Sequence, residues 1–251
     1  MINKNVILIP GILLIFSLFS YADMIEEKVT FRANSSEECL LEGILYYNSE
    51  AVDAPAIIAC HPHPQGGGEM NIPILKELAK RLGDRYSILL FNFRGVGHSQ
   101  CSFGDGSKGV EDISGSVTFV ENHPKLKPKA IFLWGYSYGS GEAFITTLQD
   151  KRVAGSVLIG FPTSYIQGFD NFNGINNKTA AMHIMIGAED KISVGMKDSV
   201  TNFVSKNYRN IKLTVIPKAD HFFAGLWGHI FEYSSDFFQG ILKGENKAAK
   251  N

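Results

Sequence analysis

The chain has 251 residues, of which 45% are hydrophobic and 20% are charged, an ordinary balance for a globular protein and compatible with one domain. Lysine plus arginine (24) nearly equals aspartate plus glutamate (25), which gives a formal net charge of −1. No basic stripe stands out along the sequence, so we expect no nucleic-acid partner.

The N-terminal segment has the layout of a secretory signal. Lys4 precedes an apolar run from Val6 to Phe19, and Ser20-Tyr21-Ala22 places small residues at the two positions that a signal peptidase recognises. We expect residues 1–22 to be cleaved as a signal peptide and residues 23–251 to form a single exported domain, periplasmic or secreted. A spanning helix needs roughly 20 apolar residues. No stable membrane span is therefore expected, and an uncleaved N-terminal anchor is the alternative.

From about residue 28, β-rich runs come first and then alternate with amphipathic helices. Lys28–Ala33 and Leu40–Tyr47 are predicted to pair as an antiparallel hairpin across a short polar stretch. The later predicted strands are Ala56–Cys60, Ser87–Phe93, Lys129–Trp134, Val153–Gly160, Met182–Gly187 and Ile211–Ile216. The predicted helices lie near Ile72–Leu82, Val110–Glu121, Tyr138–Gln149, Val194–Asn207 and Ala224–Leu242. This alternation indicates a mostly parallel, doubly wound α/β sheet, whose ligands collect beyond the carboxyl ends of its strands.

The three cysteines have different surroundings. Cys60 ends an apolar run and is expected to be a buried, inert side chain. Cys39 and Cys101 lie in polar stretches and are able to pair if the protein is exported, but spacing alone does not show that they are close. No Cys/His spacing indicates zinc, so no metal is expected.

One predicted strand runs into Gly135-Tyr-Ser-Tyr-Gly139, which places Ser137 between two glycines. The pattern fits a nucleophile elbow, in which a serine lies on a sharp strand-to-helix turn and its neighbours must lack bulk because the two backbones crowd there. A tight turn is the alternative interpretation. The apolar run before Ser137 and the helical stretch after it favour the nucleophile.

A serine hydroxyl becomes an effective nucleophile when a base takes its proton and a third group orients that base. The predicted base is His221, which follows a strand by a short loop and so is placed to reach back over the sheet edge. His183, within an apolar run, is interpreted as a core histidine. His229, within the aromatic final helix, is interpreted as a packing residue.

The acid is expected between the serine and the histidine in chain order. Asp190 follows the strand Met182–Gly187 and is the predicted acid, with Glu189 as the runner-up. Asp220 adjoins His221, and adjacent loop residues rarely aim at each other well enough to orient an imidazole. The carboxylate would accept the Nδ1 proton of the imidazole and fix its tautomer.

Two backbone N–H groups are needed for the oxyanion of an acyl-transfer intermediate. Tyr138 opens the helix after the serine, so its N–H is the first predicted donor. The second is expected in the loop after Ala56–Cys60, where the prolines lack an N–H and His61, His63 and Gln65 remain. We prefer His63. A metal site at the two histidines is disfavoured because no carboxylate pair is nearby.

The segment between the strands that end at Gly160 and begin at Met182 is too short for a large cap, so we expect an open site for small or flexible acyl groups. Phe161 and Tyr165 are predicted to contact the substrate along one wall. Phe169 and Phe172 are further candidates for that wall, although aromatic packing alone would account for all four.

Four motifs in chain order resemble those of small, lidless serine hydrolases of the α/β-hydrolase superfamily, and of one bacterial branch in particular. They are His61–Pro64 (HPHP), Phe91–Ser99 (FNFRGVGHS), Gly135–Gly139 (GYSYG) and Ala219–Phe223 (ADHFF). The similarity spans roughly residues 40–240 and implies an α/β-hydrolase fold with no large cap domain. It gives Ser137, Asp190 and His221 the roles of nucleophile, acid and base, and gives Arg94 and Gly95 a supporting role.

These features predict a serine hydrolase that cleaves small acyl esters through an acyl-enzyme, with a small-molecule acyl substrate and no cofactor. A peptidase or amidase on the same three residues is one alternative. A non-catalytic binding protein on a hydrolase scaffold is the other, and the presence of all three side chains argues against it.

Overall fold

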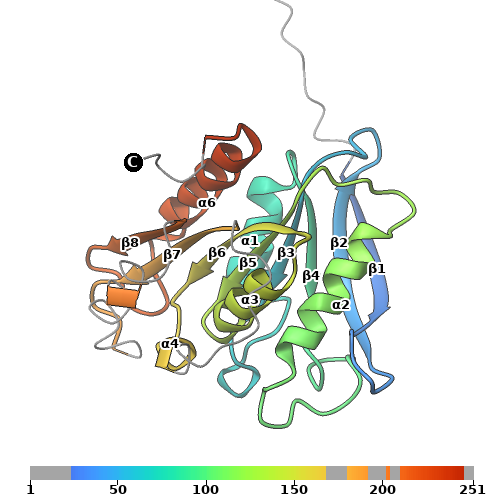
Figure 1. Ribbon diagram of the computed structural model, residues 1–251, viewed down its shortest axis with the longest axis horizontal. Helices are drawn as coiled ribbons and strands as arrows, with labels where there is room; N and C mark the ends of the chain where they lie inside the picture. The colour runs from blue at the N-terminus through green and yellow to red at the C-terminus, as the bar shows by residue number, and fades with distance from the viewer. Residues whose placement is uncertain (1–23, 168–179, 192–201, 204–209, 246–251) are drawn as a thin grey trace, which may run out of the picture.

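Eight strands form one sheet in the residues that the computed structural model describes, which are 24–167, 180–191, 202–203 and 210–245 (Figure 1). The strands are β1 Met24–Arg32, β2 Leu40–Asn48, β3 Ala56–Cys60, β4 Ser87–Phe91, β5 Ile131–Tyr136, β6 Val153–Ile159, β7 Ala181–Gly187 and β8 Ile211–Ile216. Their order across the sheet is β1-β2-β4-β3-β5-β6-β7-β8. The predicted N-terminal signal segment, residues 1–22, lies outside the described residues.

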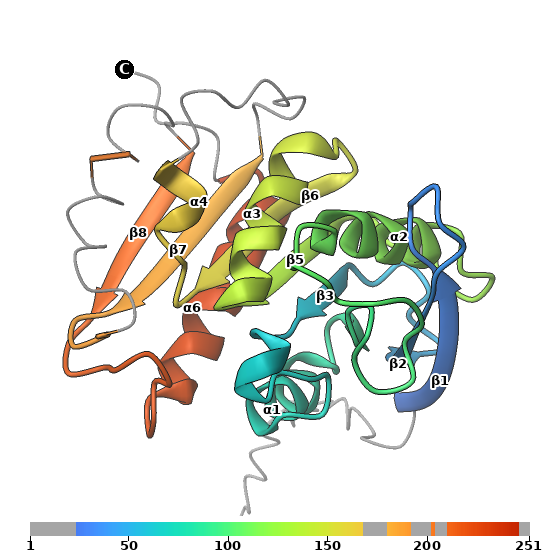
Figure 2. The same cartoon turned by 90° about the horizontal axis from the view of Figure 1, so that it is seen from below.

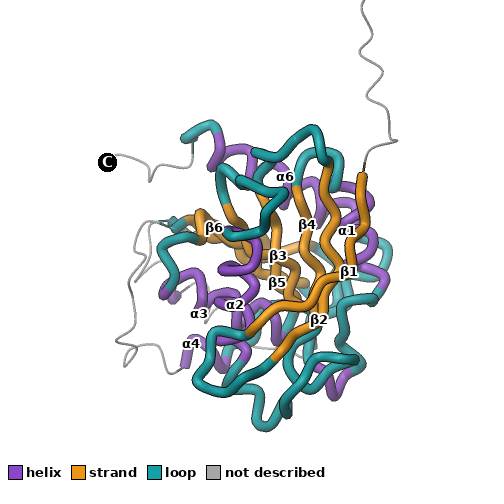
Figure 3. The backbone as a smooth tube through the Cα atoms, turned by 90° about the vertical axis from the view of Figure 1, so that its right-hand side faces the viewer, coloured by secondary structure: helices purple, strands orange, loops and turns teal. Residues whose placement is uncertain are grey.

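The sheet is mostly parallel with an antiparallel edge. β2 pairs antiparallel with both β1 and β4, from Met24 opposite Asn48 to Arg32 opposite Leu40 in the β1–β2 hairpin, whereas every pair from β4 to β8 is parallel. The hairpin lies at the right-hand edge of the sheet in Figure 1, and Figure 3 shows this side facing the viewer. Because the carboxyl ends of the parallel strands share one edge, the loops after β3, β4, β5, β6 and β7 open toward the same region. The predicted fold class is confirmed.

Helices cover both faces of the sheet (Figure 2). They are α1 Pro73–Leu82, α2 Gly109–Glu121, α3 Tyr138–Gln149, α4 Ser164–Gln167 and α6 Trp227–Leu242, with a 3-10 turn, η2, at Pro64–Gly66. α1 and α6 pack on one face through side chains such as Leu75 and Phe238, and α2 and α3 pack on the other through side chains such as Val117 and Phe144. Two apolar layers therefore sandwich the sheet, as expected for a doubly wound fold.

β4 ends two residues before the predicted boundary because other partners take over the backbone of the next two residues. The Asn92 carbonyl oxygen accepts from the Ser99 hydroxyl (2.7 Å), and the Phe93 N–H donates to the His61 ring (3.1 Å). The local polar side chains, and not the apolar run, decide where this strand stops.

The final helix begins three residues later than predicted. Phe223 and Gly225 have positive φ angles of 51° and 75°, which are incompatible with a right-handed helix, so α6 starts at Trp227. The short elements η2 and α4 were not expected. The predicted helix Val194–Asn207 lies outside the described residues except for positions 202 and 203.

Cys39 and Cys101 form a disulfide, with Cα atoms 5.8 Å apart, and Cys60 is a free, buried cysteine. The bond joins the start of β2 to the loop after β4. Among the described residues, no helix has the length and apolar character needed to cross a bilayer.

A buried ion pair fixes the loop after β4 to the first turn of α2. Arg94 is fully buried; its Nε and Nη2 donate to Asp112 Oδ1 at 2.9 and 2.7 Å, and its backbone N–H donates to Asp112 Oδ2 at 2.9 Å. Nη2 also reaches Glu111 (2.9 Å). The next residue, Gly95, has a φ of 72°, which suits a glycine. The supporting role that the resemblance gave to Arg94 and Gly95 is thus structural, at a distance from the cavity lining described below.

Breaking this pair from one side should be strongly destabilising, because the remaining charge stays buried without its partner. We expect Asp112→Leu or Arg94→Met to lower the free energy of unfolding by about 3–5 kcal/mol, and the double variant to lose less than the two losses added together. Urea unfolding of the three variants measures this. The exposed pair Arg81–Glu77 (2.6 Å) is the control, since Glu77→Gln should change stability by about 1 kcal/mol or less. Additive losses would contradict the coupling.

Candidate active site

Ser137 lies between β5 and α3 in a strained backbone conformation. Its φ and ψ are 53° and −121°, a region that a residue with a side chain rarely adopts, and its N–H donates to the Ile159 carbonyl oxygen (2.8 Å). A Cβ on Gly135 would lie 2.5 Å from the Gly139 carbonyl oxygen, and a Cβ on Gly139 would lie 2.5 Å from that of His61. Both glycines are therefore required by close approach of the backbones. The turn has the geometry of a nucleophile elbow.

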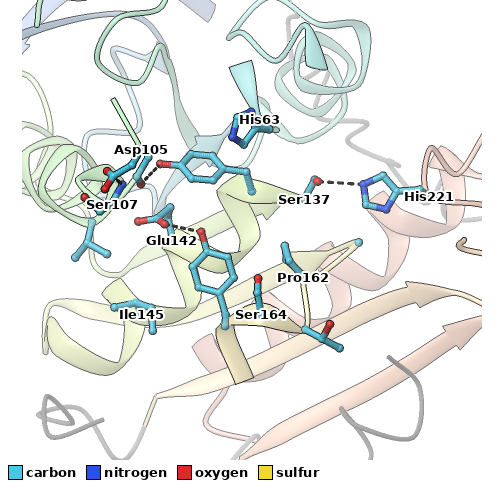
Figure 4. Close-up of a pocket in the computed structure, with 15 residues that line it drawn as sticks. His63, Asp105, Ser107, Ser137, Glu142, Ile145, Pro162, Ser164 and His221 are labelled. Carbon is cyan, nitrogen blue, oxygen red and sulfur yellow. Dashed lines mark hydrogen bonds between the residues drawn. The ribbon is translucent and has the colours of Figure 1, made fainter. Parts of the chain in front are cut away.

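The structure brings the three predicted side chains into one hydrogen-bonded chain. His221 Nε2 lies 3.0 Å from Ser137 Oγ, a contact drawn in Figure 4, and His221 Nδ1 lies 2.8 Å from Asp190 Oδ2. The imidazole and the carboxylate are both buried. Because an ionised carboxylate only accepts hydrogen bonds, Nδ1 carries the proton and Nε2 is left to accept from the serine hydroxyl.

Close packing at the ends of three strands positions the imidazole. A Cβ on Gly187, at the end of β7, would lie 2.6 Å from the Asp220 carbonyl oxygen, so a side chain there would push the histidine loop away. The Tyr136 hydroxyl, on β5, donates to the His221 carbonyl oxygen (2.9 Å). Gly160, after β6, has a φ of 55°, and a Cβ there would lie 3.0 Å from His221 Cε1. The ring has little freedom to move away from the serine.

The other acidic candidates point elsewhere. Glu189 is exposed, and so is Asp220, whose Oδ1 accepts the Phe222 backbone N–H at 3.0 Å. Neither carboxylate contacts the imidazole of His221, so of the three candidates Asp190 alone is in position to orient it.

The two other histidines that were considered as the base, His183 and His229, differ in their burial. His183 is fully buried on β7, as expected, and its Nε2 lies 2.8 Å from Thr214 Oγ1; burial lowers its pKa to about 3, which keeps the ring neutral. His229 packs at the surface and not in the core, with its ring stacked on that of Tyr233 (6.4 Å between centroids). Its side chain is exposed on α6 and lies 3.6 Å from Glu232, because it falls on the solvent face of a helix whose aromatic residues mostly face the sheet.

One of the three candidate oxyanion donors in the loop after β3 lines the cavity. His61 is fully buried, its ring accepts the Phe93 N–H, and burial lowers its pKa to about 4. The exposed Gln65 donates its N–H to His63 Nδ1 (3.2 Å). His63 itself lines the cavity, with its ring 5.3 Å from that of Tyr138. Of the three positions that the sequence left open, His63 is the one that lines the same cavity as Ser137.

A cavity of about 690 Å³ opens at Ser137 (Figure 4). Tyr165, on α4, lines it, at the place expected for a wall. Phe161 does not line it; its fully buried ring packs in the core behind the cavity. Phe169 and Phe172 lie outside the described residues. Within the described residues, no group of three or more His, Cys, Asp or Glu side chains is arranged to hold a metal ion.

Sequence reasoning missed a buried acid in this cavity. Glu142, on α3, is 4% exposed and lines the cavity; its Oε1 accepts the Tyr165 hydroxyl at 2.6 Å. Burial raises its pKa to about 7 from an ordinary 4.5. One signal in the sequence was available. Glu142 is the one charged residue in the stretch Tyr138–Gln149, so it has no charged neighbours on this helix with which to form a solvent-facing side.

This raised pKa has a definite effect on stability. Between pH 4.5 and 7 the folded protein holds a proton on Glu142 that the unfolded chain has released, so stability falls as pH rises through that window. The difference in pKa corresponds to at most about 3 kcal/mol. Glu142→Gln cannot titrate. The stability of the wild type relative to this variant should therefore decrease from pH 4.5 to pH 8 in urea unfolding, while Glu232→Gln, an exposed control on α6, should follow the wild type. A constant difference between wild type and Glu142→Gln would contradict the assignment.

Comparison with known proteins supports the assignment of the fold. A family model of the α/β-hydrolase fold matches residues 55–179. Uncharacterized protein RP471 of Rickettsia prowazekii is 30% identical over 184 residues, which cover 71% of this chain and 76% of that protein.

Solved structures agree over most of the chain. A putative α/β hydrolase from Agrobacterium tumefaciens, ATU1826, is similar with a TM-score of 0.72 and 26% identity, over 87% of this chain and 98% of that one. An α/β serine hydrolase homologue from Coxiella burnetii gives a TM-score of 0.68 and 28% identity, over 82% and 94%. The chain belongs to the α/β-hydrolase family and is a hydrolase.

Proposed function

We propose that the protein hydrolyses small acyl esters through an acyl-enzyme formed on Ser137. The observation that carries the proposal is the continuous chain Asp190–His221–Ser137, with contacts of 2.8 and 3.0 Å, at the mouth of a cavity of about 690 Å³. The hydroxyl is at the cavity, its base is within hydrogen-bond reach, and the base is oriented by a buried carboxylate. These are the three requirements for an activated serine nucleophile.

In the first half-reaction, His221 takes the proton of Ser137 as the serine oxygen attacks the acyl carbonyl. The backbone N–H groups of Tyr138 and His63 receive the developing oxyanion, and the first of these gains from the N-terminal end of the α3 dipole. The imidazolium then gives its proton to the leaving alcohol, and the carbon–oxygen bond of the ester breaks. Asp190 stabilises the imidazolium through its 2.8 Å contact with Nδ1.

In the second half-reaction, water attacks the acyl-enzyme. His221 accepts a proton from this water, the oxyanion forms again at the same donors, and the proton returns to Ser137 as the acid leaves. Ser137 and His221 both line the cavity, so the base that activates the serine is also at hand for the attacking water.

Substitution of the serine tests the nucleophile. We expect a fluorophosphonate probe to label the wild type and not Ser137→Ala, and kcat/KM on p-nitrophenyl acetate and butyrate to fall by about 10⁴-fold or more. Aminoacyl nitroanilides assayed in parallel examine the peptidase alternative, and turnover of these in preference to the esters would refute ester hydrolysis. Failure of the wild type to react with the probe would favour a binding protein on the hydrolase scaffold.

A matched pair of aspartates tests the acid. Asp190→Asn keeps the shape of the side chain but removes the charge that fixes the imidazole tautomer, so we expect kcat to fall by about 10³- to 10⁴-fold. Asp220→Asn is the control, because Asp220 adjoins His221 in the chain and does not contact its ring. Equal losses in the two variants would show that Asp190 has no special role.

Export through the segment 1–22 is part of the proposal. The Cys39–Cys101 disulfide supports it, because such bonds persist in oxidising compartments. We expect mass spectrometry of the native protein to find an N-terminus at Asp23, and thiol titration of the denatured, unreduced chain to find one thiol, that of Cys60. An intact Met1 on the native protein would exclude cleavage.

A further inference from the structure

The cavity beside Ser137 is acidic at the end away from the serine. Its lining includes two carboxylates, Asp105 and Glu142, and no lysine or arginine among the described residues. Figure 4 places Ser137 and His221 at one end of the cavity and Asp105 at the other, with Glu142 on the side of Asp105. An acyl group bound to the serine would thus extend toward two carboxyl groups.

Glu142 is held rigidly in this wall. Its Oε1 accepts the Tyr165 hydroxyl at 2.6 Å, and the Val110 backbone N–H also donates to the carboxylate. Gly141 makes room for this arrangement, since a Cβ there would overlap the Tyr165 ring, with three ring atoms at 2.5 Å or less. A Cβ on Gly109 would lie 2.7 Å from Glu142 Oε2. The carboxylate therefore has a fixed position and direction, as a recognition group requires.

The carboxylate has no cationic partner within the described residues. The cations that flank α2 pair with other groups: Arg94 with Asp112 at 2.7 Å and Lys108 with Glu37 at 3.3 Å. A carboxylate has about four acceptor sites, and the protein groups named above supply two donors. Burial without a compensating charge raises the pKa of Glu142 to about 7. A donor or a cation brought by a ligand would satisfy the remaining acceptors.

A purely structural role is the competing explanation. The Val110 N–H belongs to the first turn of α2, so Glu142 also serves the N-terminal end of that helix. That role would not require a group that lines the substrate cavity or a tyrosine hydroxyl from α4. It would also leave substrate preference unaffected when Glu142 is replaced, which makes the two explanations separable.

The spacing along α3 gives a lower limit for the length of a suitable acyl group. Glu142 follows Ser137, the N-cap of α3, by five residues, which corresponds to an axial rise of about 7.5 Å in an α-helix. An extended six-carbon acyl chain with one further atom at its end spans a comparable distance.

We propose that Glu142, positioned by Tyr165, makes the enzyme select acyl groups whose far end carries a hydrogen-bond donor, either a hydroxyl or an ammonium group. The inference rests on the proposed ester hydrolysis and adds the substrate class. Apolar acyl groups of equal length leave the remaining acceptor sites of the buried carboxylate unfilled and are disfavoured.

The test uses p-nitrophenyl esters that differ only at the end of the chain. 6-Hydroxyhexanoate and 6-aminohexanoate carry the donor, and heptanoate replaces it by a methyl group of similar size. For the wild type we expect kcat/KM on the donor esters to exceed that on heptanoate by about 10- to 100-fold. In Glu142→Met the ratio should fall to near one for both donor esters.

Two more conservative variants distinguish the hydroxyl from the ammonium group and are less apt to disturb the fold. Glu142→Gln keeps an acceptor but no charge, so it should lose the preference for 6-aminohexanoate and retain part of the preference for 6-hydroxyhexanoate. Tyr165→Phe should reduce both ratios, because the carboxylate loses the hydroxyl that orients it. Glu232→Gln, on α6 and away from the cavity, is the control and should keep the ratios of the wild type. Circular dichroism and the midpoint of urea unfolding show that each variant is folded.

The outcomes distinguish this inference from the proposed function. If the wild type hydrolyses p-nitrophenyl acetate in a Ser137-dependent manner but shows the same donor-to-heptanoate ratio as the folded Glu142 variants, the inference is wrong and ester hydrolysis stands. If the wild type hydrolyses none of the esters, both are wrong. Donor-to-heptanoate ratios that exceed ten in the wild type and fall in the Glu142 variants support the inference.

Discussion

The site depends on one steric constraint, the close approach of three backbones at Ser137. The serine is held at a φ of 53°, and the turn exists because Gly135 and Gly139 have no Cβ to meet the α3 backbone and the loop after β3. Such strain persists only where the surrounding structure over-determines it. Here the sheet provides that structure: β5 lies between β3 and β6, and the Ser137 N–H is tied to Ile159 at 2.8 Å. The elbow points the hydroxyl away from the sheet, toward the loops that carry its partners.

The parts of the site differ in how well the sequence predicts them. Ser137, His221 and Asp190 were found because each follows an apolar strand that ends at a short polar loop, and parallel strands deliver such loops to one edge. The strands themselves were predicted because a strand that is buried on both faces is a nearly unbroken apolar run. The boundaries that failed, at Phe93 and Ala224, were set by side-chain hydrogen bonds and positive φ angles, which leave no periodic signal.

Glu142 was missed for a different reason. Its burial results from the packing of α2 and α4 against α3, and the residues that enclose it, Val110 and Tyr165, lie 32 and 23 positions away in the chain. Periodicity describes one helix and its own faces, so it cannot show that two other elements close over a charged position. The prediction for Phe161 was wrong because a position directly after a strand does not show which way the side chain points. The residues that follow it, from Pro162 to Tyr165, line the cavity, and the Phe161 ring packs in the core.

The cavity therefore has two parts, the sheet edge that holds Ser137 and His221 and a wall of side chains opposite them. Backbone geometry and glycines fix the first, and most substitutions there would move the hydroxyl or the imidazole. Side chains on α2, α3, α4 and the loop after β4 form the second. The Arg94–Asp112 pair anchors that loop to α2, while the Tyr138 hydroxyl donates to the Gly106 carbonyl oxygen of the same loop at 2.8 Å. Because Tyr138 also opens α3, the wall is held in register with the elbow without contributing to the chemistry. Exchange of a wall residue such as Glu142 leaves the elbow in place, because the backbone contacts that hold Ser137 do not involve that side chain.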